Sequence, residues 1–281
     1  MTARAGCRRT RGYPMTRRVA LLMLSALVVL PALAQDGGAK KRRPLPPEFG
    51  RVVLNNGSEK AGLAPVSFDH WFHRAKYTCR LCHVDIGFAM KAGATGIKAA
   101  DNQAGFYCGA CHNGKLVVDG RKTFESCGKA LIGENRAQCL RCHSVGKGVT
   151  PIHDFATFTK NLPKGRFGNG VDWEKAEEAG LIKPVDFLEG VSIPRKSFTA
   201  QKDFALSPKL QGMPDILFSH KKHTVWNGCE LCHPEIFVGV KKGTTKYSMV
   251  EIFQGKYCGA CHVTVAFPLI DCGRCHTTPV Q

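Results

Sequence analysis

Six copies of the pattern Cys-x-x-Cys-His occur in this chain of 281 residues, and no other feature restricts its fold as strongly. The pattern contains 12 of the 14 cysteines and six of the 11 histidines. Composition alone predicts far fewer than one copy, so the six copies are not accidental. They are Cys79/Cys82/His83, Cys108/Cys111/His112, Cys139/Cys142/His143, Cys229/Cys232/His233, Cys258/Cys261/His262 and Cys272/Cys275/His276.

The spacing of each copy fits the covalent attachment of haem. Two thiols add to the two vinyl groups of one porphyrin as thioethers, and the next residue gives its imidazole to the iron. A disulfide framework needs no histidine after every second cysteine. Zinc sites do not demand adjacent cysteine and histidine six times, and a thioredoxin-like site would be a single motif. The sequence therefore predicts six covalently bound haem c groups.

The chain also repeats itself at an offset of 150 residues. The offset relates residues 105–112 to residues 255–262, and the third motif of each half matches after deletion of 17 residues from the second half. Such repetition indicates two copies of one structural unit. Around the first motif, Phe68, His70, His73, Cys79, Leu81, Cys82, His83 and Ile86 recur as Phe218, His220, His223, Cys229, Leu231, Cys232, His233 and Ile236.

Two pairs of histidines precede the first motif of each half. His70 and His73, like His220 and His223, are three residues apart, so both rings project from one helical face. A lone histidine is usually a surface or core residue. Here the pair is duplicated at the same offset, and each ferric haem needs a sixth ligand. We therefore expect these four histidines to be distal ligands of neighbouring haems.

Phe-x-His-x-x-His ahead of three Cys-x-x-Cys-His motifs resembles the trihaem cytochrome c7 domain of the cytochrome c3 superfamily, over about residues 65–145 and 215–277. Each half is similar to one unit of the tandem c7 cytochromes. The resemblance implies a c3/c7-like fold, in which short helices and much irregular chain, with little β structure, pack around the haems. It also implies four ligand pairs: His70 with His83, His73 with His112, His220 with His233, and His223 with His262.

The third haem of the second half lacks an obvious histidine partner. In simple c7 proteins a histidine just before the second motif is the ligand, and neither half has one there. In tandem c7 domains this ligand can be a methionine, so the resemblance makes Met249 the candidate partner of His276. The alternative is an ordinary core methionine. A methionine ligand raises the potential of a haem, so we expect this haem to be the last of the six to lose its electron.

The first half departs from this pattern, because Ala99 stands at the position equivalent to Met249. The third haem on His143 could be ligated by His153 or by Met90, or its iron could be open. We favour His153, which lies ten residues past His143 and has no counterpart in the second half.

The N-terminus is typical of an export signal. Several arginines precede an almost unbroken apolar run over residues 19–30, and Ala32-Leu33-Ala34 matches a cleavage site. A retained anchor is the alternative, but 12 apolar residues are too few to span a bilayer, which needs roughly 20. We predict a signal peptide over residues 1–34, a periplasmic location, and no membrane span after cleavage.

The remaining chain divides into four predicted parts. An N-terminal tail covers residues 35–64, and trihaem units cover residues 65–153 and 215–281. A connector over residues 154–214 lacks cysteine and is rich in aromatic residues, so we expect it to pack on both units. An N-cap residue, an acidic start and a final glycine predict a short helix over residues 172–180. Cys127 lies outside every motif and is interpreted as a free thiol without a role.

The charge of the chain bears on its partners. Cleavage would remove six arginines and no acid, which lowers the formal charge from +18 to +12. Each ferric haem adds about −1, leaving about +6. An exported protein rarely meets nucleic acid, so we expect redox partners such as acidic cytochromes or electron-transfer complexes of the inner or outer membrane.

Three functions remain open from the sequence. We favour the first, a periplasmic electron carrier in anaerobic respiration or extracellular electron transfer, which the resemblance implies; on this interpretation the chain is not an enzyme. The second is a multihaem reductase subunit whose third haem in the first unit is open. The third is a subunit that polymerises or docks in a larger complex.

Overall fold

The computed structural model describes residues 42–128, 136–144, 154–196, 199, 202–208, 212–239 and 241–278. The chain divides between Arg43 and Pro44, and all the secondary structure below belongs to the part that begins at Pro44. The predicted signal peptide and its cleavage site lie outside the described residues. Within the described ranges, no helix has the length and apolar character needed to cross a bilayer.

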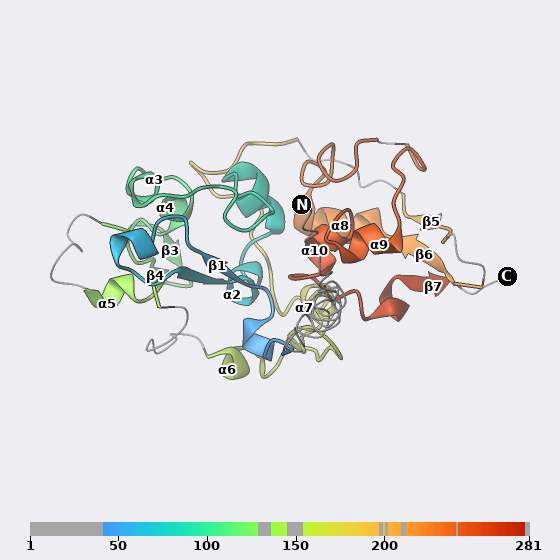
Figure 1. Cartoon of the computed structure of the whole chain (residues 1–281), viewed down its shortest axis with the longest axis horizontal. Helices are drawn as coiled ribbons and strands as arrows, with labels where there is room; N and C mark the ends of the chain where they lie inside the picture. The colour runs from blue at the N-terminus through green and yellow to red at the C-terminus, as the bar shows by residue number, and fades with distance from the viewer. Residues whose placement is uncertain are drawn as a thin grey trace, which may run out of the picture. The chain divides into compact units, whose positions relative to one another are not determined.

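The first repeat consists of short elements, coloured blue to green in Figure 1. β1 pairs antiparallel with β2, with Arg51 opposite Asp69. Part of the segment predicted as an N-terminal tail is therefore hydrogen-bonded to the first trihaem unit. The elements are η1 (Pro46–Glu48), β1 (Arg51–Leu54), η2 (Glu59–Ala61), β2 (Val66–Asp69), α2 (His70–Arg74), η3 (Leu81–Asp85), α3 (Ala99–Gln103), α4 (Cys108–Cys111), β3 (Val117–Val118), β4 (Arg121–Lys122) and α5 (Arg136–Cys139).

In the second repeat, orange to red in Figure 1, α8, α9 and α10 stand at the positions of α2, α3 and α4, and η3 has no counterpart among the described residues. α9 begins 150 residues after α3. Three antiparallel strands form a sheet in the order β5-β6-β7. The strand β5 comes from the predicted connector, so this segment also pairs with the second unit. The elements are β5 (Phe204–Leu206), β6 (Asp215–Phe218), α8 (His220–Asn227), α9 (Met249–Phe253), α10 (Gly259–His262), η5 (Cys272–Arg274) and β7 (His276–Thr278).

The repetition extends to the backbone conformation. Tyr107 and Tyr257, which precede the second motif of each half, have φ of 47° and 53°. Left-handed φ is uncommon for residues other than glycine. The same unusual conformation at equivalent positions indicates that both halves build this attachment loop in the same way.

The connector contains α6 (Phe155–Thr159) and α7 (Trp173–Glu178). The side chain of Asp172 accepts a hydrogen bond from the backbone N–H of Lys175, so it caps α7 as the sequence predicts. The connector packs on α2 of the first repeat and on Trp226 of α8, as expected. The cluster consists of Trp71, Ala75, Val171, Trp173, Ala176 and Ile182, with Phe72, Phe155, Phe158, Leu162 and Trp226 against it.

Outside this cluster, the described residues form little ordinary core. Leu81 is the one large side chain that is fully buried among the described residues. Short helices, irregular chain and few strands surround a cavity of about 2750 Å³. Short helices, much irregular chain and little β structure agree with the architecture predicted from the sequence.

Candidate cofactor-binding site

Most of the predicted site residues line the cavity. A pocket for one small molecule is about 300–1,000 Å³, and the volume here is about 2750 Å³, enough for several large planar groups. All the described cysteines and histidines of the predicted site line it except five. Those five are Cys139, His143, His220, Cys229 and His233.

The histidine side chains share one hydrogen-bonding arrangement. In nine of the ten described histidines, Nδ1 lies within hydrogen-bond distance of a backbone carbonyl oxygen. A carbonyl only accepts, so Nδ1 carries the hydrogen and Nε2 keeps its lone pair for a metal. The pairs are His70–Gly50, His73–Asp69, His83–Phe88, His143–Ala64, His220–Lys202, His223–Ser219, His233–Phe237, His262–Phe267 and His276–Pro214.

Two histidine pairs of the first repeat have the spacing of a shared metal. The rings of His70 and His83 are nearly parallel, at 5°, with 6.4 Å between ring centroids. The rings of His73 and His112 are 6.3 Å apart at an angle of 69°. A metal bound to two imidazole nitrogens at about 2 Å each places the ring centroids about 6 Å apart. The distances therefore leave room for one iron between the rings of each pair.

The second repeat reproduces one of these pairs. The ring centroids of His223 and His262 are 6.3 Å apart, and the angle between the rings is 60°. For the other predicted pair, His220 and His233, the structure records no contact between the two rings. Their Nδ1 atoms still face the carbonyls of Lys202 and Phe237, as in the other pairs.

Burial lowers the pKa of the histidines that form these pairs. Desolvation is the main cause, and it brings the pKa of His70, His73 and His262 to about 4. The rings are therefore neutral near pH 7. A neutral imidazole is the form that binds a metal.

The cysteines suit thioether formation better than metal ligation. All 13 described cysteines are free of disulfides. Burial is the main cause that raises the pKa of Cys82, Cys108 and Cys261 to about 12, so these thiols are not thiolates at neutral pH. Among the described residues, no three His, Cys, Asp or Glu side chains form a group that could hold a metal ion. A zinc site would need four such ligands together.

The candidate ligands of the third haems are only partly placed. Met249 begins α9, is 42% exposed and lines the cavity together with His276. Met90 is 41% exposed and also lines the cavity. His153 lies outside the described residues. The roles of these three side chains stay predictions.

Sequence reasoning assigned no role to the phenylalanines beside the histidine pairs. The ring of Phe68 lies 4.8 Å from that of His70 and 4.4 Å from that of His73. Phe218 repeats these contacts with His220 and His223, at 5.0 and 4.5 Å. The phenylalanine therefore helps to hold both rings in place. Its recurrence at the 150-residue offset was the available signal.

Comparisons with known proteins agree with these features. The family model for cytochrome c7 and related cytochrome c matches residues 66–144 and 216–277. No protein of the curated set matches the chain.

Three solved structures are similar to the chain. A c7-type three-haem cytochrome domain is 37% identical, with 29% of this chain and 99% of that chain covered and a TM-score of 0.25. The C-terminal hexahaem fragment of GSU1996 is 23% identical, covering 84% and 99%, with a TM-score of 0.24. The dodecahaem cytochrome c GSU1996 is 27% identical, covering 83% and 76%, with a TM-score of 0.26.

Proposed function

Because this chain belongs to the family of cytochrome c7 and related cytochromes c, we propose that it carries electrons through six covalently bound haems in the periplasm. The chain is a multihaem c-type cytochrome, and electron transfer is the activity of its family. The haem count, the location and the respiratory role are the proposed parts. The observation that carries the proposal is the spacing of the histidine pairs, 6.3 to 6.4 Å between ring centroids.

Paired histidines favour a carrier over an enzyme. Haem c, when bound, supplies an iron that changes between Fe(III) and Fe(II) by one electron. Two histidines that bound the same haem iron would leave no open coordination site for a substrate. In each Cys-x-x-Cys-His motif the cysteines would hold the porphyrin and the histidine would bind the iron. His70, His73, His220 and His223 would each supply a second ligand.

The third haem of each repeat would use a different ligand. We assign Met249 to the haem on His276, since both residues line the cavity. We assign His153 to the haem on His143. With these assignments each proposed haem would have two protein ligands.

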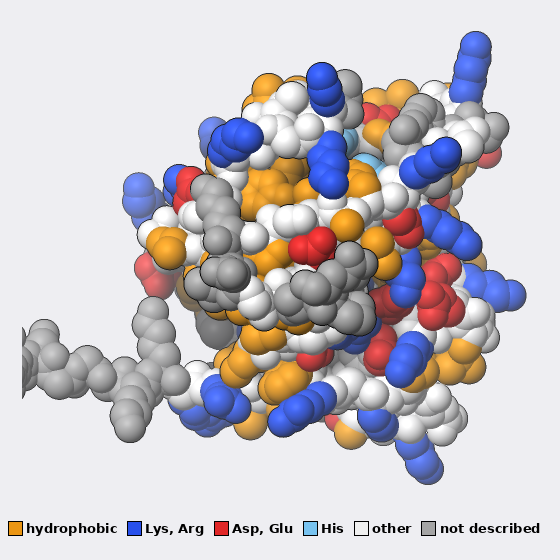
Figure 2. All heavy atoms as spheres, turned by 90° about the vertical axis from the view of Figure 1, so that its right-hand side faces the viewer, with side chains coloured by type: hydrophobic (Ala, Val, Ile, Leu, Met, Phe, Trp, Pro, Cys, Tyr) orange, Lys and Arg blue, Asp and Glu red, His pale blue; other side chains and the backbone are white. Residues whose placement is uncertain are grey.

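The partners are proposed to be redox proteins with acidic surfaces. Lysine and arginine side chains project from many points of the face shown in Figure 2, whereas the acidic side chains gather mostly on one side of it. A basic surface attracts an acidic partner and speeds the encounter at low ionic strength. We place this exchange in anaerobic respiration or extracellular electron transfer.

Carbon monoxide binding separates a carrier from a reductase. The reduced holoprotein is expected to give no CO difference spectrum and no turnover with nitrite, hydroxylamine or tetrathionate. The His70→Ala variant serves as a positive control, because it removes one axial ligand and should let one haem in six bind CO. A CO spectrum from one haem of the unaltered protein, together with turnover, would instead support the reductase.

A further inference from the structure

The first attachment loops of the two repeats, residues 79–83 and 229–233, lie against each other. Arg80 in the first loop is buried, and its side chain packs on Gly228, which directly precedes the second loop. A Cβ atom on Gly228 would come within 2.5 Å of Cδ of Arg80. Gly228 has φ of 61°. Glycine is therefore favoured at position 228 for two reasons: a larger side chain would collide with Arg80, and the backbone has a left-handed φ.

The connector binds the first of these loops through Val185 and Asp186. The carbonyl of Val185 accepts a hydrogen bond from the N–H of Thr78 at 3.1 Å. Asp186 Oδ1 accepts from the hydroxyl of Thr78 at 2.7 Å and from Nε of Arg80 at 3.1 Å. Asp186 also forms an ion pair with Arg80 through Oδ2.

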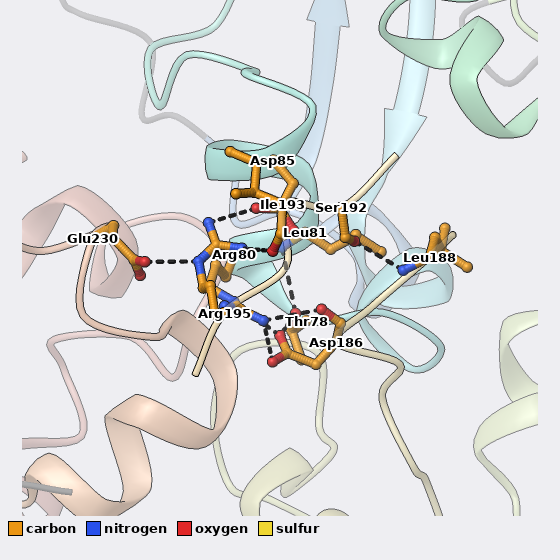
Figure 3. Close-up of polar contacts among 10 residues, drawn as sticks. All are labelled: Thr78, Arg80, Leu81, Asp85, Asp186, Leu188, Ser192, Ile193, Arg195 and Glu230. Carbon is orange, nitrogen blue, oxygen red and sulfur yellow. Dashed lines mark hydrogen bonds and ion pairs between the residues drawn. The ribbon is translucent and has the colours of Figure 1, made fainter. Parts of the chain in front are cut away.

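Ten residues further along the connector, Arg195 reaches both loop regions, as Figure 3 shows. Its Nη2 lies 2.6 Å from Oδ1 of Asp85, two residues after His83. Its Nε donates to Oε1 of Glu230, inside the second loop, at 2.7 Å. The side chain of Asp85 is 0% exposed. A carboxylate buried to this degree is stable only with a cation beside it, and Arg195 is the one recorded among the described residues.

We propose that Arg195 is a positioning residue that fixes the separation between the first haem of one repeat and the first haem of the other. The proposal rests on haem attachment at both loops. It places the junction between the two trihaem units at their first haems. An electron that crosses between the units would oxidise one of these irons as it reduces the other.

The cysteines of the two loops support this placement. The thiols of Cys79 and Cys232 lie close enough to interact electrostatically. Cys79 belongs to the first repeat and Cys232 to the second, so their sulfur atoms are neighbours. The thioether bonds of the two first haems would then be close together.

The test compares Arg195→Gln with Lys196→Gln in the full chain carrying its haems. Lys196 is the next residue and is exposed, so its variant removes the same charge without touching the loops. Haem methyl signals are followed by proton NMR at successive stages of oxidation. Arg195→Gln removes a positive charge beside the first loop, and a less positive environment favours Fe(III) in the first haem of the first repeat. The potential of that haem should fall, and Arg195→Lys should restore part of the shift.

A second pair of variants covers the case in which Arg195→Gln does not assemble. Glu230→Gln removes the ion pair between Arg195 and the second loop and leaves Asp85 unaltered, and Glu235→Gln removes an exposed acid near the same loop. The signals of both first haems should move in Glu230→Gln and stay unchanged in Glu235→Gln.

Each result bears on one claim. Suppose that every variant carries six haems, but the signals of the first haems do not shift in Arg195→Gln or Glu230→Gln. This result would overturn the positioning role and leave the proposed function standing. Absence of haem from the unaltered protein would overturn the proposed function itself.

Discussion

His112 differs from the other described histidines in its hydrogen bonding. Its Nδ1 is buried and has no hydrogen-bond partner. At the equivalent position of the second repeat, His262 donates to the carbonyl of Phe267 at 2.9 Å. After His112 the chain turns differently, because Asn113 Oδ1 accepts from the N–H groups of Lys115 and Leu116. No carbonyl therefore reaches the His112 ring.

This difference predicts unequal potentials for the second haems of the two repeats. A hydrogen bond from Nδ1 makes the imidazole a stronger donor and stabilises Fe(III). The haem on His112 should therefore have a higher potential than the haem on His262. An NMR-monitored redox titration with assigned haem methyl signals measures both. Equal potentials, or the reverse order, would contradict the role given to this hydrogen bond.

At the residue scale the sequence predicts the chemistry of the site well. The motifs and the 150-residue offset led to three histidine pairs, and in the structure the ring centroids of each pair are 6.3 to 6.4 Å apart. The carbonyls that orient the rings were not predictable. Gly50 and Ala64, for example, are loop residues whose carbonyls reach His70 and His143 through tertiary contacts. No local pattern of residue types marks such a carbonyl.

At the scale of elements, the second attachment motif of each repeat packs closely on the helix before it. A Cβ at Gly259 would overlap the carbonyl oxygen of Ile252 in α9, and a Cβ at Gly109 would overlap that of Asn102 in α3. The glycine in each Cys-Gly-Ala-Cys-His motif is therefore required by the crossing of two short helices rather than by haem attachment.

This packing predicts a difference between two Gly→Ala substitutions. Gly259→Ala forces the two helices of the second repeat apart and should lower the free energy of unfolding by about 1–3 kcal/mol. Gly273 occupies the same place in the third motif, but a Cβ there meets nothing within 4 Å. Gly273→Ala should stay within about 0.5 kcal/mol of the unaltered protein. Denaturant unfolding followed by haem absorbance measures both, and equal midpoints for the two variants would refute the packing argument.

Elements with local signals were predictable, and elements that need distant partners were not. The capping aspartate and final glycine predicted α7 correctly. The sheet β5-β6-β7 joins the connector, the start of the second repeat and the end of the chain. Its strands are only three or four residues long, too short for a clear alternation of polar and apolar residues.

At the scale of the whole molecule, the chain has too little apolar core for its size. Nine hydrophobic residues are buried among those described, whereas the cavity measures about 2750 Å³. Without bound groups in the cavity, a chain of this length would bury little apolar surface and would gain little folding free energy from it. We infer that the porphyrins complete the core, so that folding and haem attachment depend on each other.

The mass of the denatured protein tests the central claim most directly. Thioether bonds survive denaturation, so protein made with a working cytochrome c maturation system should weigh six haems of about 616 Da each more than its polypeptide. A pyridine haemochrome assay should give the same count per chain. Colourless protein with the mass of the bare polypeptide would contradict the account.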